Sequence, residues 1–97
     1  MGITYTDSYE TRKAHSEMAV NDVNYVIDYI IKSPIDGKAN EVNATFYQGD
    51  DKKRIGYGSY YESASSVRFD SSANVPFDAQ KAVSEQFYTD VEQILVG

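Results

Sequence analysis

Cysteine and histidine, two side chains that often act as catalysts or metal ligands, are scarce in this sequence. Its 97 residues include no cysteine and a single histidine, His15. Without cysteine, disulfides, thiolate metal sites and cysteine nucleophiles are excluded. A serine nucleophile would depend on His15 as its base, and no serine lies in a G-x-S-x-G motif. We therefore predict that the protein is not an enzyme and that it uses no cofactor.

Carboxylates are more numerous, but their spacing does not match a known metal site. Asp50 and Asp51 are adjacent, and the positive charges of Lys52, Lys53 and Arg54 follow them directly. Those charges compete with a cation for the same carboxylates. The chain has no EF-hand spacing, no H-E-x-x-H and no Walker motif. The sequence therefore predicts no metal site.

A third group of residues is typical of binding to another protein. Glycines in a strand allow another chain to approach the backbone closely, and Tyr and Arg combine a large contact area with polar groups. The residues predicted to form such a surface are Tyr47, Arg54, Gly56, Gly58, Tyr60 and Arg68. In the alternative interpretation, the glycines accommodate a β-bulge and the tyrosines reflect strand propensity.

Acidic residues offer a second candidate surface, because 15 acidic side chains against 9 basic ones give a net charge of −6. Asp78, Glu85 and Glu92 recur at intervals that bring them to one side of a helix. Such a stripe would steer the protein toward a basic partner, including a nucleic-acid-binding protein. Direct contact with nucleic acid is not expected, since it depends on clustered Lys and Arg. Alternatively, the acidic residues simply solvate the helix.

The elements that position these residues follow from the spacing of apolar side chains. From Asp7 or Ser8 up to Ser33-Pro34, apolar residues recur at helical intervals within an arc of roughly 100° and predict a first helix. The members of this arc are Ala19, Val23, Val26, Ile27 and Ile30. Pro34 ends the predicted helix. Ile3 and Tyr5 are candidates for a short additional strand.

From residue 42 onward the apolar spacing becomes two, which predicts three short strands. The inward-facing side chains are expected to be Val42, Ala44 and Phe46, then Ile55, Tyr57, Ser59 and Tyr61, then Val67 and Phe69. A last helix is predicted from about Pro76 to Val96. Its apolar face is expected to contain Val83, Phe87, Val91 and Ile94, with Phe77 and Leu95 at the edge. The predicted fold is a single α+β domain, residues 1–97, in the order α-β-β-β-α. Both helices would pack on one face of a three-stranded antiparallel meander and leave the other face open to water.

These features together favour a small protein-binding module, an inhibitor or adaptor that covers part of another protein. Phage-encoded inhibitors of host defence nucleases, including anti-CRISPR proteins, and toxin-immunity proteins are similar in size, acidity and lack of catalytic motifs, although no specific motif is shared. One alternative is a homo-oligomeric structural protein, such as a homodimer, that pairs through the open sheet or the strand near residues 66–70. Another is a small-molecule-binding domain that uses Tyr57, Tyr61 and Arg68. With no secretory signal and no apolar run long enough for a bilayer, a cytoplasmic location is expected.

Overall fold

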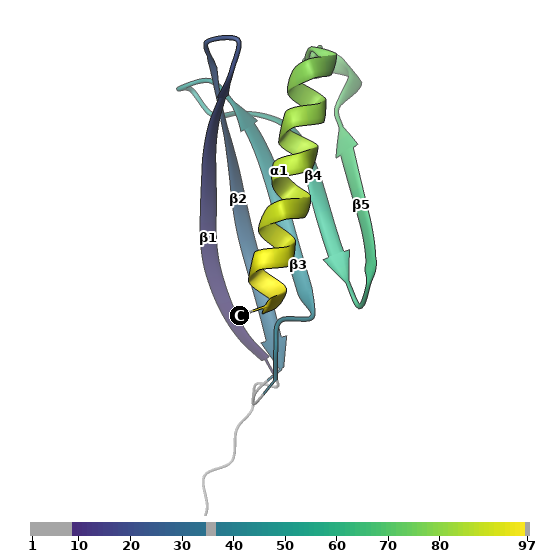
Figure 1. Cartoon of the computed structure of the whole chain (residues 1–97). Helices are drawn as coiled ribbons and strands as arrows, with labels where there is room; N and C mark the ends of the chain where they lie inside the picture. The colour runs from purple at the N-terminus through teal and green to yellow at the C-terminus, as the bar shows by residue number, and fades with distance from the viewer. Residues whose placement is uncertain (1–8, 35–36, 97) are drawn as a thin grey trace, which may run out of the picture.

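The computed structural model describes residues 9–34 and 37–96, which form an antiparallel sheet of five strands with one helix against it (Figure 1). The strands are β1 (Tyr9–Val20), β2 (Val23–Pro34), β3 (Glu41–Gln48), β4 (Lys53–Tyr61) and β5 (Ala64–Phe69). A turn of 3-10 helix (Ser71–Ala73) leads into the helix α1 (Phe77–Val96). The strands lie in the sheet in the same order as in the chain, so the sheet is a simple meander.

The predicted first helix is wrong, because residues 9–34 form a long β-hairpin instead. β1 and β2 pair from Tyr9 opposite Pro34 to Val20 opposite Val23. Asn21 and Asp22 form the connecting turn with positive φ angles of 52° and 66°. Two such residues give a turn whose twist matches that of the paired strands. The expected three-stranded sheet with two helices is therefore a five-stranded sheet with one helix, and the predicted strand at residues 3–5 lies outside the described residues.

The composition of β2 explains why this segment prefers a strand. Tyr25, Ile27, Tyr29 and Ile31 alternate along β2 and are all buried on one face. Val26, on the opposite face, is half-buried. Because both faces carry apolar side chains, the segment also satisfies a helical spacing, which is why the sequence alone misleads. β-branched and aromatic residues favour the pleated strand, and the hairpin buries the whole alternating set.

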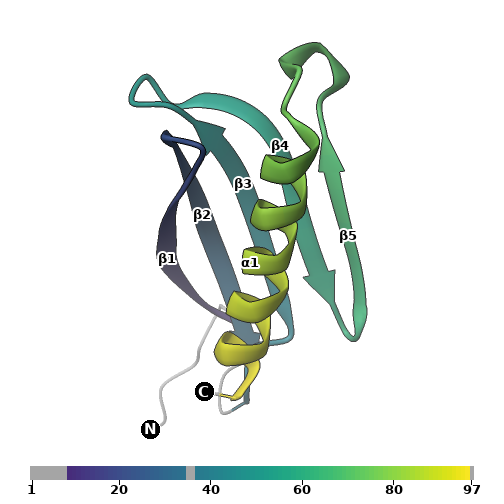
Figure 2. The ribbon, with the colours of Figure 1, turned by 45° about the horizontal axis from the view of Figure 1, so that its top comes forward.

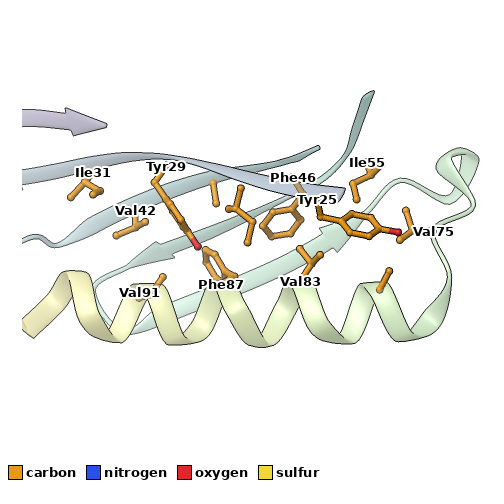
Figure 3. Close-up of a cluster of buried hydrophobic side chains, with 13 residues drawn as sticks. Tyr25, Tyr29, Ile31, Val42, Phe46, Ile55, Val75, Val83, Phe87 and Val91 are labelled. Carbon is orange, nitrogen blue, oxygen red and sulfur yellow. The ribbon is translucent and has the colours of Figure 1, made fainter. Parts of the chain in front are cut away.

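The helix α1 completes the core by covering one face of the sheet, as Figures 1 and 2 both show. Its buried residues Ala79, Val83, Phe87 and Val91 lie four positions apart along one side. They pack against the buried side chains of β2, β3 and β4 (Figure 3). The Phe87 ring lies 6.0 Å from the Phe46 ring and 6.3 Å from the Tyr29 ring, measured between centroids. The predicted last helix and its apolar face are thus confirmed.

The opposite face of the sheet is covered by no other layer formed by residues 9–34 or 37–96. We call this the outer face and the face under α1 the inner face. None of the helices in the described part of the chain is long and apolar enough to span a membrane.

Candidate binding surface on the outer face of the sheet

The strand registers bring side chains from all five strands together in rows across the outer face. One row runs through His15, Asp28, Thr45, Tyr57 and Arg68, each opposite the next on the neighbouring strand. A second row, one step along the strands, contains Glu17, Val26, Tyr47 and Arg54. Side chains directly opposite each other lie about 5 Å apart at their Cβ atoms. Each row is therefore a continuous strip of surface.

A β-bulge in β4 determines which of its residues reach the outer face. Phe46 lies opposite Gly56, but the next residue, Tyr47, lies opposite Arg54, so Ile55 is an extra residue in β4. Ile55 and Gly56 are both buried as a result. Beyond the bulge the alternation is reversed, and Tyr57 stands on the outer face.

The bulge corrects the predicted orientation of three candidate binding residues. Gly58 faces the inner side, where a Cβ would lie 2.9 Å from Phe87 Cε1. Gly56 is buried against β5, and a Cβ there would clash with the backbone of Arg68. Tyr60 is half-buried and packs against the core. The prediction that Gly56, Gly58 and Tyr60 are exposed on the open face is therefore wrong, because one extra residue inverts the strand after Ile55.

Tyr57 and Tyr61 take the outward positions that strict alternation had assigned to Gly58 and Tyr60. The two residues are 42% and 52% exposed, although both were predicted to face inward. The two glycines could have indicated this inversion, since glycine inside a strand often marks a bulge.

The other predicted residues of this surface do lie on the outer face. Arg54 and Arg68 are exposed there, and Tyr47 is half-buried. Ile30 is 43% exposed on the same face and was not predicted to belong to it. Exposed aromatic, aliphatic and guanidinium groups are thus combined on one surface.

The charges of the outer face nearly balance, although the whole chain is strongly acidic. The basic residues of its strands are Lys13, Lys32, Arg54 and Arg68, and the acidic residues of its strands are Glu17, Asp28 and Glu41. Asp70, directly after β5, adds a further carboxylate beside Arg54. Lys32 Nζ lies 3.5 Å from Glu41 Oε2, and Arg54 Nε lies 3.8 Å from Asp70 Oδ2. Among the described residues, Arg68 forms no ion pair, so its guanidinium is free to meet an acceptor from outside.

A depression of about 430 Å³ lies on this face over β1, β2 and β3. The side chains of Lys13, His15, Asp28, Ile30, Asn43, Thr45 and Tyr47 contribute to its lining. His15 and Asp28 lie opposite each other, but no group of three or more potential metal ligands occurs among the described residues. The lining combines hydrogen-bond donors, one carboxylate and an apolar side chain. A protein surface carries acceptors, donors and apolar groups that can contact each of them.

The acidic stripe is a separate surface. Asp78, Glu85 and Glu92 are all exposed on α1, and α1 lies on the inner side of the sheet. Asp78 accepts a hydrogen bond from Asn21 Nδ2 at 3.3 Å. The sheet separates these carboxylates from Tyr57 and Arg68, so the structure does not bring the two predicted surfaces together.

Comparison with known proteins gives no match to any family model, any curated protein or any solved structure. The outer face must therefore be interpreted from its own residues.

Proposed function

We propose that this protein is a non-enzymatic binding module that docks onto another protein through the outer face of its sheet. The observation that carries the proposal is the group of exposed residues on that uncovered face, Tyr57, Tyr61 and Arg68, with Tyr47 and Arg54 beside them. Tyr and Arg are enriched among the residues that contribute most to the affinity of protein interfaces.

The size of the face supports this function. Five strands spaced about 4.8 Å apart, each contributing about eight residues of 3.4 Å, give an area of about 650 Å² before side-chain relief is counted. A standard protein interface buries about 800 Å² on each partner. Because the side chains project from hydrogen-bonded strands, ordering them on binding costs less conformational entropy than ordering a loop.

The charge distribution favours a protein as the partner. Nucleic-acid binding depends on clustered Lys and Arg, whereas here four basic residues are interspersed with three acidic ones. The net charge of −6 would also steer the molecule toward a basic partner at long range. In this proposal the protein acts in the cytoplasm as an inhibitor or an adaptor. It covers a functional surface of its partner, as anti-defence and immunity proteins do.

The test compares capture of a partner by the full chain and by two surface variants. Tyr57→Ser combined with Arg68→Ala removes the centre of the outer face, whereas Tyr88→Ser removes a comparably exposed aromatic on α1. We expect a partner protein to be captured by the original chain and by the Tyr88 variant, and to be lost with the outer-face variant.

Circular dichroism should show that both variants keep the fold, because all three positions are exposed. Retention of the partner by the outer-face variant would contradict the proposal. Loss of the partner with Tyr88→Ser alone would assign binding to the helix side.

A further inference from the structure

The edge of the sheet formed by β1 is long, regular and unpaired among the described residues. β1 has twelve residues, contains neither proline nor glycine, and pairs with β2 without a register shift. Its other side has no neighbouring strand in the described sheet. Monomeric proteins usually protect such an edge by shortening it, bending it with a bulge or placing proline in it. β5, at the opposite edge, is half as long with six residues.

Charged side chains are another common protection of a sheet edge, and β1 carries several. Their order along the strand is nevertheless complementary to itself. If two copies of β1 pair in antiparallel fashion about a two-fold axis at His15, Lys13 of each copy lies opposite Glu17 of the other. Residues directly opposite in an antiparallel pair share a face, so both Lys–Glu pairs form on the outer face. Registers centred on Lys13 or on Glu17 would instead place like charges together.

On the inner side of β1, the residues next to this two-fold axis are small and have free space beside them. Ala14 of one copy lies opposite Ser16 of the other. A depression of about 240 Å³ lies between β1 and α1, with Ala14, Ser16, Gln93 and Ile94 in its lining. Space next to the axis allows a second strand to approach without displacing α1.

We propose that β1 pairs with β1 of a second copy of this chain, across a two-fold axis at His15. The two sheets of five strands then form one continuous sheet, with both helices on the same side. The homodimer uses the free backbone edge of β1, whereas the docking function rests on Tyr57, Tyr61 and Arg68 of β4 and β5, so the two stand or fall separately. Pairing would place two outer faces side by side and double the surface offered to a partner.

The experiment measures the mass of the full chain by light scattering and sedimentation over a concentration series at low salt. We expect the mass to rise from 10.9 kDa to twice that value. Lys13→Glu places two pairs of like charges across the axis and should weaken the dimer roughly tenfold. Glu17→Lys should have a similar effect.

The decisive variant combines both changes, because Lys13→Glu with Glu17→Lys restores two opposite-charge pairs. We expect its dimer affinity to return to within about threefold of that of the original chain. Lys53→Glu, an equally drastic charge change on β4, three strands away from β1, is the matched control and should leave the affinity unchanged. All these side chains are exposed, so folding should not be affected.

Three results would overturn the proposal. The first is a monomer at every concentration, and the second is a dimer that Lys13→Glu leaves intact. The third is a combined variant that stays as weak as the single ones.

Discussion

At the scale of single residues, the Asp90 carboxylate joins the helix to the edge of the sheet. Its Oδ2 accepts hydrogen bonds from the Ser16 and Tyr29 hydroxyls, both at 2.6 Å, and its Oδ1 accepts one from Gln86 Nε2 at 2.8 Å. Ser16 belongs to β1, Tyr29 to β2, and Gln86 lies one turn earlier on α1. Hydrogen bonds to an ionised acceptor are stronger than neutral ones. This cluster therefore fixes the position of α1 relative to the two N-terminal strands.

Tyr29 makes this cluster sensitive to alkaline pH. Burial, then the hydrogen bond to Asp90 and the charge of that carboxylate, raise the pKa of Tyr29 above its ordinary value of about 10. The unfolded chain therefore loses the phenolic proton at a lower pH than the folded chain. The stabilising contribution is complete below about pH 10 and is lost as the pH rises further.

We predict that Tyr29→Phe flattens the fall in the free energy of unfolding above about pH 10. Below that pH the variant should cost about 1.5–3 kcal/mol, because it loses one hydrogen bond to a charged group. Urea denaturation at a series of pH values measures both effects. Tyr25, whose pKa burial also raises, should keep part of the slope. Tyr61→Phe, at an exposed position, is the control, and an unchanged slope in Tyr29→Phe would contradict the prediction.

At the scale of elements, the close contact of β4 with α1 depends on Gly58. A Cβ at this position would lie 2.9 Å from Phe87 Cε1 and 3.1 Å from Phe46 Cζ. Both rings are fully buried and have little room to move. We predict that Gly58→Ala lowers the free energy of unfolding by about 1–3 kcal/mol through overpacking. Ser66→Ala, on the exposed side of β5, should change it by less than about 0.5 kcal/mol. Chemical denaturation distinguishes the two, and a neutral Gly58→Ala would show that α1 shifts freely.

The sequence could predict those elements in which only one periodicity fits. Val42, Ala44 and Phe46 alternate with polar residues, and Val83, Phe87 and Val91 recur at helical spacing, so β3 and α1 were found. The β1–β2 hairpin was missed because apolar residues occupy both faces of β2 and so satisfy a helical period as well. Asn21-Asp22, a pair that tolerates positive φ, was the local signal for a turn.

The candidate surface was predicted in part for a related reason. Tyr47, Arg54 and Arg68 lie on the outer face as expected, because β3, the start of β4 and β5 alternate regularly. Alternation cannot locate an inserted residue, and the extra residue Ile55 exchanged the faces of Tyr57 and Gly58. A bulge depends on how two strands pair, which a single strand's sequence does not specify.

At the scale of the whole molecule, α1 packs against the sheet through a single core of side chains. The buried residues of α1 contact a core drawn from β2, β3 and β4, and half-buried residues of β1 and β5 pack around it. Among the described residues the buried apolar side chains form this one cluster, so neither the sheet nor the helix has a core of its own. Residues 9–34 and 37–96 should therefore unfold together as one cooperative unit.

Phe87 is the side chain on which this cooperativity depends most, since its buried ring packs near both Tyr29 and Phe46. We predict that Phe87→Ala lowers the free energy of unfolding by about 3–5 kcal/mol. Tyr88→Ala, the adjacent exposed aromatic on α1, should cost less than about 1 kcal/mol. Far-ultraviolet and near-ultraviolet circular dichroism should report the same midpoint for each variant, because loss of the helix uncovers the whole inner face. A far-ultraviolet signal that persists after the near-ultraviolet signal of the packed aromatic side chains has been lost would show that the strands are stable without the packing of α1. That result would contradict the single shared core.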